Sequence, residues 1–243
     1  MSAGGPRIRC LKMPAARVRM PAIMNQIQRI NWGLLDYAES LERMRQRHAD
    51  RVADEVGDAI ICVEHPRVFT LGKQGGRDNI LLTDQELEEK GFSVYHVERG
   101  GDVTYHGPGQ AVVYPVIDLR QLKIGVKALV EAVAGCIVDT AAHYGLESHY
   151  DPDNPGVWVS GRKLAAIGMA VPKKVSMHGL AMNVTTNLDD FALIRACGHE
   201  YPPTSLAQET GYSFDMDQVH TLLYQFLSQR LLGARGTLGG ERH

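Results

Sequence analysis

The stretch Arg99-Gly-Gly-Asp-Val-Thr-Tyr-His-Gly-Pro-Gly-Gln110 is the part of the sequence that decides the fold. Four glycines and a proline fall within these twelve residues. Glycine loses more conformational freedom on folding than any other residue, so such density indicates backbone that must approach something closely. Strand-length apolar runs flank the stretch at residues 93–97 and 111–117. We therefore predict a strand–turn–strand element at a small-molecule site, with an ordinary glycine-rich hairpin as the alternative. The polar groups available for binding there are Arg99, Thr104, Tyr105 and His106.

The composition excludes several classes of protein. The chain has 243 residues, enough for a core in one large domain or two small ones. Its net charge of −2 argues against nucleic-acid binding through a basic surface, and no apolar run approaches the ~18 residues of a membrane span. Four widely spaced cysteines without a CxxC pattern favour reduced thiols in the cytoplasm over disulfides or zinc. The ten histidines lack metal-site spacing, so we expect no metal.

The first residues differ in character from the rest. Residues 1–24 carry five basic side chains, three prolines and no acidic residue. They lack the apolar core of a secretory signal, and the prolines and few serines disfavour an organelle transit peptide, which stays one alternative. The other alternative is a start assigned too far upstream of Met20 or Met24. We predict a disordered basic leader over residues 1–24, one catalytic domain over residues 25–233 and a tail over residues 234–243.

Strand and helix patterns interleave after the leader. Strands are predicted at residues 26–31, 59–63, 157–160, 164–171 and 177–184, besides the two that flank the glycine-rich stretch. Helices are predicted at residues 34–52, 126–144 and 215–232, with short ones near 189–194 and 205–209. Thr83-Asp-Gln-Glu86 is a capping box that opens a brief helix ended by Gly91. Because no strand–helix–strand unit of constant length recurs, we predict a mixed α+β fold with much antiparallel pairing.

Lys163 lies in the first of three further segments with chemical character, Ser160-Gly-Arg-Lys-Leu-Ala-Ala-Ile-Gly168. A hairpin turn at Gly161 brings Lys163 onto a strand that becomes apolar at once, which is an unusual place for an ammonium group. A partly desolvated lysine there can act electrostatically on a neighbour. The alternative is a lysine at the hairpin edge that reaches solvent.

The other two segments contain a histidine and a cysteine. In His178-Gly-Leu-Ala-Met-Asn183 the histidine is either a structural residue with local hydrogen bonds or a catalytic base. In Ile194-Arg-Ala-Cys-Gly-His199 the cysteine, Cys197, lies in a loop between short helices. Cys62 and Cys136 fall within periodic apolar runs and are interpreted as core residues. Cys197 is therefore the candidate nucleophile.

The order of these segments resembles the lipoyl(octanoyl) transferases, which move octanoyl from acyl carrier protein in lipoate biosynthesis. The similar segments are RGGDVTYHGPGQ (99–110), EHPRVFTLGKQG (64–75), GRKLAAIG (161–168), HGLAMNV (178–184), Cys197-Gly198 and Thr204-Ser205-Leu206. The resemblance covers about residues 25–215. It implies the catalytic-domain fold of biotin and lipoate protein ligases, with a mostly antiparallel sheet and flanking helices.

The resemblance also implies roles for particular residues. Cys197 is the nucleophile that carries the acyl thioester, and Lys163 lowers the pKa of its thiol. The implied substrate-binding residues are Arg99, Gly100, Gly101, Asp102, Val103, Thr104, Tyr105, His106, Ala166, Ile167, Gly168, Gly179, Leu180 and Ala181. One departure concerns the nucleophile loop, because the family usually has Pro-Cys-Gly and an aliphatic residue where this chain has Ala196-Cys197-Gly198-His199.

The implied reaction needs two protein partners and no cofactor. Octanoyl-acyl carrier protein is the donor, and lipoyl domains of 2-oxoacid dehydrogenases and the glycine cleavage H protein are the acceptors. Because such partners are acidic, we expect a basic rim from Arg43, Arg45 and Arg47 or from Lys173 and Lys174. We expect a cytoplasmic monomer that contacts neither membrane nor nucleic acid. The alternatives are an ATP-dependent lipoate or biotin ligase and an inactive acyl-binding homologue.

Overall fold

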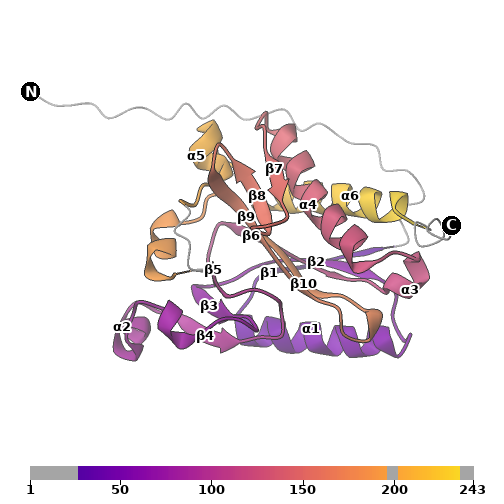
Figure 1. Cartoon of the computed structure of the whole chain (residues 1–243), viewed down its shortest axis with the longest axis horizontal. Coiled ribbons are helices and arrows are strands. Elements are labelled where there is room, and N and C mark those ends of the chain that lie inside the picture. Colours follow the sequence, from indigo (N-terminus) through magenta and orange to yellow (C-terminus); the bar gives the residue numbers. More distant parts are fainter. Residues whose placement is uncertain (1–26, 196–201, 236–243) are drawn as a thin grey trace, which may run out of the picture.

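The computed structural model describes residues 27–195 and 202–235, which contain two β-sheets and flanking helices (Figure 1). The large sheet has the strand order β1-β2-β6-β10-β9-β8-β7, and the small sheet has the order β4-β3-β5. The strands of the large sheet are β1 (Gln28–Leu34), β2 (Ala59–Glu64), β6 (Gln110–Val116), β7 (His149–Asp151), β8 (Gly156–Val159), β9 (Arg162–Ala170) and β10 (Met177–Asn183). Those of the small sheet are β3 (Val68–Leu71), β4 (Ser93–His96) and β5 (Val103–His106).

Antiparallel pairing predominates in both sheets. The pairs β1–β2 and β3–β4 are parallel. The pairs β2–β6, β6–β10, β10–β9, β9–β8, β8–β7 and β3–β5 are antiparallel. The sheet class expected from the sequence is therefore confirmed.

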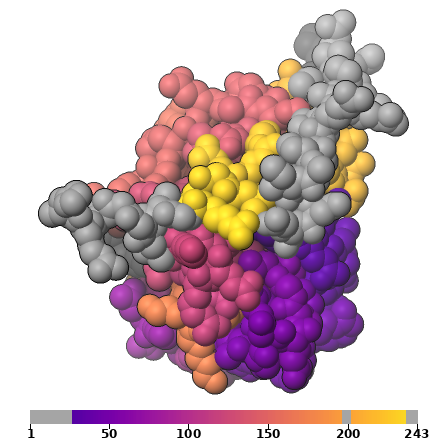
Figure 2. Space-filling view, turned by 90° about the vertical axis from the view of Figure 1, so that its right-hand side faces the viewer, coloured from indigo at the N-terminus to yellow at the C-terminus, as the bar shows by residue number. Residues whose placement is uncertain are grey.

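Helices cover the large sheet on both faces. The helices are α1 (Tyr37–Val52), α2 (Asp84–Glu89), α3 (Leu119–Leu122), α4 (Val126–His143), α5 (Leu206–Thr210) and α6 (Met216–Gly233), with short 3₁₀ turns η2 (Arg77–Asn79), η3 (Pro172–Lys174) and η4 (Leu188–Leu193). Helices α4 and α6 pack together on one face, and Figure 2 shows α6 in yellow beside the segment of α3 and α4. Helix α1 packs on the other face. Residues Ile60 and Cys62 of β2 enter the first cluster and Ile61 and Val63 the second, as the two-residue period of a strand requires.

Local signals explain where several helices begin. The side chain of Asp36 accepts hydrogen bonds from the backbone N–H groups of Ala38 and Glu39, so α1 begins at Tyr37 rather than at residue 34, which ends β1. The capping box of Thr83 and Glu86 is present as predicted. Strand β3, strand β7 and helix α3 are short elements that the sequence patterns did not indicate.

The prediction of a strand–turn–strand element at residues 99–110 is wrong. This stretch contains a strand of its own, β5, and the strands on either side of it belong to different sheets. Gly101 and Gly109 adopt φ values of +83° and +79°, conformations that glycine reaches without strain, and they flank β5. Gly101 therefore serves the turn between β4 and β5 within the small sheet, and Gly109 serves the turn by which the chain passes from β5 to β6 of the large sheet.

Candidate functional site

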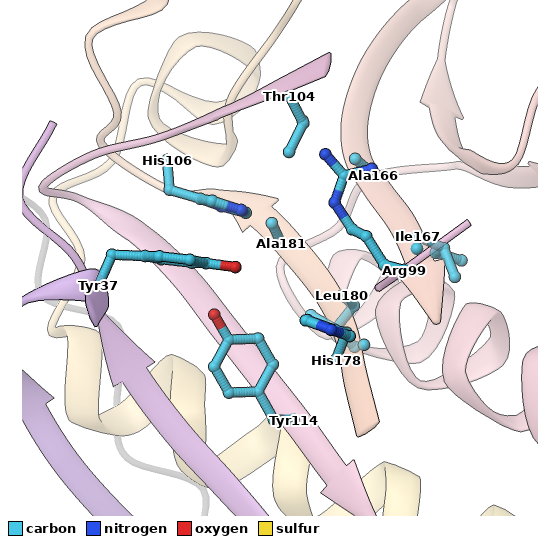
Figure 3. Close-up of a pocket in the computed structure, with 12 residues that line it drawn as sticks. Tyr37, Arg99, Thr104, His106, Tyr114, Ala166, Ile167, His178, Leu180 and Ala181 are labelled. Atoms are coloured by element: carbon cyan, nitrogen blue, oxygen red, sulfur yellow. The ribbon is translucent and has the colours of Figure 1, made fainter. Parts of the chain in front are cut away.

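A cavity lies between the large sheet and the layer formed by α1 and the small sheet (Figure 3). Nine of the residues that the sequence predicted for substrate binding line it, namely Arg99, Thr104, His106, Ala166, Ile167, Gly168, Gly179, Leu180 and Ala181. Tyr37, Tyr114 and His178 complete the lining. The structure thus brings together segments that lie far apart in the sequence.

The remaining predicted binding residues contact other parts of the fold. The carboxylate of Asp102 accepts hydrogen bonds from Asn79 at 2.7 and 2.9 Å. Tyr105 donates to Asp190 at 2.8 Å, and with Val103 it belongs to the apolar cluster of the small sheet. Gly100 donates its N–H to the carbonyl of Met169 at 3.0 Å, and the carbonyl of Gly101 accepts from Gln74 at 3.1 Å. These residues hold the loop that carries Arg99.

One wall of the cavity is a paired strip of small residues. In the β9–β10 register Ala166 lies opposite Ala181, Ile167 opposite Leu180 and Gly168 opposite Gly179. The two short runs that the sequence singled out therefore form one patch of sheet. An apolar chain can lie along such a patch because few side-chain atoms rise above the backbone.

Part of this space is already occupied by Arg99. Its side chain is buried and donates to the carbonyl of Thr70 at 2.6 Å and to the hydroxyl of Thr70 at 2.9 Å. A Cβ at Gly168 would lie 3.0 Å from Arg99 Cδ, and a Cβ at Gly72 would lie 2.8 Å from Arg99 Nη1. The absence of side chains at these two glycines is thus what allows the guanidinium to lie at the cavity.

A chain of hydrogen bonds fixes the tautomer of His106. Asn183 donates to the carbonyl of Thr204 at 2.9 Å, so its side-chain oxygen is free to accept from Gln110 at 3.0 Å. Gln110 uses its amide nitrogen for this bond and for the carbonyl of Tyr105, so its oxygen accepts from His106 Nδ1 at 2.7 Å. Burial lowers the pKa of His106 to about 3, so the ring is neutral at pH 7 and its Nε2 carries a lone pair.

The tautomer of His65, a residue for which no role was predicted, is fixed in the same way. Its Nδ1 donates to the carbonyl of Leu35 at 2.9 Å, so its Nε2 accepts from the hydroxyl of Tyr114 at 2.8 Å. Burial lowers the pKa of His65 to about 4. The ring of Tyr37 stacks on His106 with centroids 5.9 Å apart, and the hydroxyls of Tyr37 and Tyr114 both point into the cavity (Figure 3).

His178 combines burial with an unusual backbone. It has a φ of +58° within β10, a region that non-glycine residues enter rarely, with histidine among the more tolerant. Its Nε2 lies 3.4 Å from Glu98, and burial lowers its pKa to about 4, so the ring is neutral at pH 7. A neutral imidazole that lines the cavity is compatible with both roles considered for His178, a structural residue and a catalytic base.

Because His65, His106 and His178 are neutral in the folded state, we expect the free energy of unfolding to decrease in mild acid. A histidine whose pKa is lowered in the folded state binds its proton in the unfolded state first, so stability is full above about pH 6.5 and falls as the pH drops toward 4. We expect each to cost roughly 2 kcal/mol at pH 5 relative to pH 7. Urea unfolding at the two pH values measures this loss.

A single substitution tests the assignment. Asparagine also tolerates positive φ, so His178→Asn should keep the fold and reduce the loss between pH 7 and pH 5 by roughly 2 kcal/mol. The matched control is His96→Asn, at an exposed position of β4, which should leave the loss unchanged. An equal acid response in wild type and His178→Asn would contradict the shifted pKa of His178.

Lys163 lies where the hairpin prediction put it, near the start of β9. Ser160 and Gly161 form the two-residue turn, with φ values of +48° and +77°, as hairpins of this length favour. The ammonium of Lys163 lies 5.2 Å from the centroid of the Trp158 ring. Its backbone N–H donates to the carbonyl of Pro202 at 3.0 Å, and its carbonyl accepts from Thr204 at 2.9 Å. Pro202 and Thr204, which follow residues 196–201, are therefore held beside Lys163 by backbone hydrogen bonds.

Cys197 lies outside the described residues, as do its neighbours Ala196, Gly198 and His199. The described residues on either side are anchored. Arg195 donates its N–H to the carbonyl of Asn79 at 2.8 Å, and Pro202 pairs with Lys163.

The three arginines of the expected basic rim make ion pairs or hydrogen bonds within the chain, whereas its two lysines are exposed. Arg43 pairs with Glu39, and Arg45 pairs with Glu98. Arg47 donates to Gln28 and to the carbonyl of Gly57. Lys173 and Lys174 are exposed in η3, after β9.

Two further observations concern metals and membranes. Within residues 27–195 and 202–235, no group of three or more His, Cys, Asp or Glu side chains is arranged to hold a metal ion. In the same part of the chain, none of the helices has the length and apolar character needed to cross a bilayer.

Comparison with solved structures identifies the class of the fold. A lipoate protein ligase from T. acidophilum with bound lipoic acid aligns with a TM-score of 0.68 at 14% identity, covering 85% of this chain and 86% of that one. The apo structure of the biotin protein ligase from Aquifex aeolicus aligns with a TM-score of 0.53 at 10% identity, covering 85% and 71%. The expected ligase-like catalytic domain is confirmed.

Comparison of sequences identifies the family. The model of the lipoyl protein ligase A/B catalytic domain matches residues 36–228, and the chain belongs to this family. The octanoyltransferase of Syntrophobacter fumaroxidans is 43% identical over 192 residues, which cover 79% of this chain and 84% of the relative. The octanoyltransferase of Bacteroides fragilis is 38% identical over 213 residues, covering 83% and 96%. The family indicated by the sequence motifs is thereby confirmed.

Proposed function

We propose that this chain transfers an octanoyl group from octanoyl-acyl carrier protein to a lysine of lipoyl domains, with Cys197 and Lys163 as the catalytic pair. The activity is supported by relatives named octanoyltransferase at 38–44% identity over most of the chain. The residue pair is supported by one structural observation. Residues 196–201, which contain Cys197, are followed directly by Pro202, whose carbonyl accepts a hydrogen bond from the backbone N–H of Lys163.

The reaction proceeds in two balanced steps. A free cysteine has a pKa of about 8.5, so a few per cent is thiolate at neutral pH. The positive charge of Lys163 increases this fraction by favouring the thiolate. Cys197 Sγ attacks the octanoyl carbonyl and forms a bond to its carbon, the bond from that carbon to the carrier sulfur breaks, and the departing carrier thiolate takes up the proton that the Cys197 thiol lost. Exchange of one thioester for another is nearly neutral in energy, so this step needs no ATP.

In the second step a lysine of the lipoyl domain attacks the acyl-cysteine. The carbon–nitrogen bond forms, the bond to Cys197 Sγ breaks, and the proton released by the amine passes to the departing thiolate. Because an amide is more stable than a thioester, this step lowers the free energy. The small side chains of Ala166 and Ala181, together with the exposed backbone of the strip, offer the octanoyl chain an apolar surface, while Ile167 and Leu180 pack into the cluster on the other face of the sheet. Burial there contributes several kcal/mol, at about 0.8 kcal/mol per methylene.

The natural acceptors in this proposal are the lipoyl domains of 2-oxoacid dehydrogenases and the glycine cleavage H protein. We propose that the enzyme works in the cytoplasm as a monomer. The free thiols of the buried residues Cys62 and Cys136 are consistent with a reducing compartment.

Two reaction mixtures test the function. Purified protein is incubated with octanoyl-acyl carrier protein and an unmodified lipoyl domain without ATP, and we expect octanoylation of one lysine. When the acceptor is omitted, intact-mass analysis should show one octanoyl group on the enzyme, and peptide mapping should assign it to Cys197. A requirement for ATP and free octanoate would identify a ligase instead. Binding without transfer would identify an inactive homologue.

The role of Lys163 predicts a shift in the reactivity of Cys197. Lys163→Met removes the charge while keeping most of the side-chain volume, so we expect the pKa for alkylation of Cys197 to rise by about one unit or more. The measurement is the rate of iodoacetamide labelling of Cys197 against pH, followed by peptide mass spectrometry. The control Lys174→Met changes an exposed lysine in η3 and should leave the profile unchanged. An unchanged profile in Lys163→Met would remove its assigned role.

A further inference from the structure

Trp158 lies directly opposite Lys163 because of an irregularity in strand pairing. In the β8–β9 ladder Val157 pairs with Ala165, but the register then shifts by one residue, and Trp158 pairs with Lys163. Side chains that lie opposite each other in an antiparallel pair share one face of the sheet. A regular ladder would have placed Leu164, which faces the other side, opposite Trp158. The irregularity therefore brings the indole and the ammonium together.

The neighbouring strand leaves room for the lysine side chain. A Cβ at Gly156 would lie 2.6 Å from Lys163 Cε and 3.3 Å from Lys163 Nζ. The aliphatic part of Lys163 therefore lies across a position that has no side chain. The indole is held as well, since Trp158 is 5% exposed and its Nε1 donates to the carbonyl of Asn154 at 3.3 Å.

We propose that Trp158 is a positioning residue for the transfer reaction, which holds the Lys163 side chain over Gly156 as a charged ammonium through a cation–π contact. The contact itself is the 5.2 Å approach of Nζ to the ring centroid. The inference rests on the proposed role of Lys163. A tryptophan face attracts a cation more strongly than the other aromatic rings do, and it has no comparable attraction for a neutral amine. Trp158 therefore favours the charged form and limits the freedom of a flexible side chain.

This contact separates two roles for Lys163. A residue held in its charged form acts as a fixed positive charge for a nearby thiolate and is less suited to accept a proton from the attacking amine. In the absence of the ring we expect the neutral fraction of Lys163 to rise roughly threefold and the kcat for transfer to fall roughly threefold to tenfold. The KM for the carrier protein should stay unchanged, because Trp158 does not line the cavity of the apolar strip.

The first experiment measures the Lys163 amine itself. In a Cys197→Ser background, an amine-directed reagent labels the protein at one fixed pH, and mass spectrometry follows the Lys163 peptide. Trp158→Leu should increase the labelling rate roughly threefold, and Trp158→Phe should restore most of the protection. The chain has one other tryptophan, Trp32, which also lies under a cation, Arg43, at 6.0 Å. Trp32→Leu is the matched control: it should change neither the labelling in this background nor the kcat of protein in which Cys197 is intact.

A second experiment avoids any change in side-chain shape. Because the chain contains two tryptophans, fluorotryptophans incorporated into a Trp32→Phe protein report on Trp158 alone. Successive fluorines weaken the negative face of the ring, so Lys163 labelling should rise and kcat should fall stepwise with fluorine number. A flat series in folded protein would overturn the proposal. This outcome differs from failure of the proposed function, in which Cys197 acquires no octanoyl group while Lys163 labelling still responds to the ring.

Discussion

Replacement of Cys197 by serine is expected to abolish octanoyl transfer, lowering kcat by roughly a thousandfold or more. A serine hydroxyl is hardly ionised at neutral pH, and an adjacent ammonium stabilises a thiolate without supplying a base for a hydroxyl. The measurement is the initial rate of lipoyl-domain octanoylation, together with intact-mass analysis after donor treatment. Cys197→Ser should show neither product nor the adduct of one octanoyl group.

The two core cysteines provide the controls for this prediction. Burial raises the pKa of Cys62 to about 11 and raises that of Cys136 further, so neither supplies thiolate at neutral pH. Both side chains lie in the cluster between the large sheet and helices α4 and α6. Cys62→Ala and Cys136→Ala should therefore retain transfer. Full activity in Cys197→Ser, or an octanoyl group mapped to a core cysteine, would exclude Cys197 as the nucleophile.

Elements with local signals were predictable from the sequence. The hairpin of β8 and β9 follows from Ser160-Gly161, the helix α2 from its capping box, and α4 and α6 from long apolar periodicities. Strand β3 carries no such signal, because it has only four residues. Its pairing with β4 and β5 also depends on segments that come later in the chain, so no local pattern indicates it. For the same reason the sequence could not show that β4 and β6 belong to different sheets.

The site divides in a similar way. The glycine-rich stretch was found from its glycine density, and the two small-residue runs were assigned to substrate binding from the resemblance to a family. The β9–β10 register explains why the two runs meet. Tyr37, His65 and Tyr114 were missed as site residues, because each sits in or beside an apolar run and is indistinguishable there from a core residue. Their place in the site depends on the meeting of α1, β2 and β6. Their ionisation depends on burial, which has no local sequence signal.

The two glycines of the small-residue strip are expected to respond very differently to alanine. A Cβ at Gly179 would lie 2.1 Å from the carbonyl oxygen of Val113 and 2.7 Å from Pro115 Cδ. That carbonyl belongs to β6, which pairs on both sides with β2 and β10 in the centre of the sheet, so it cannot move aside cheaply. We expect Gly179→Ala to lower the free energy of unfolding by about 3 kcal/mol or more, as measured by urea titration.

Gly168 is the matched position, because it lies directly opposite Gly179 in the β9–β10 register. A Cβ there would lie 3.0 Å from Arg99 Cδ, which belongs to a side chain that can shift by a few tenths of an ångström. Gly168→Ala should therefore cost less than about 1 kcal/mol of stability. It should instead raise the KM for the octanoyl donor, because the displaced guanidinium lies at the cavity. Equal destabilisation by the two substitutions would mean that the strip serves only strand packing. The expected difference assigns Gly179 to the close approach of β10 and β6, and Gly168 to the shape of the acyl site.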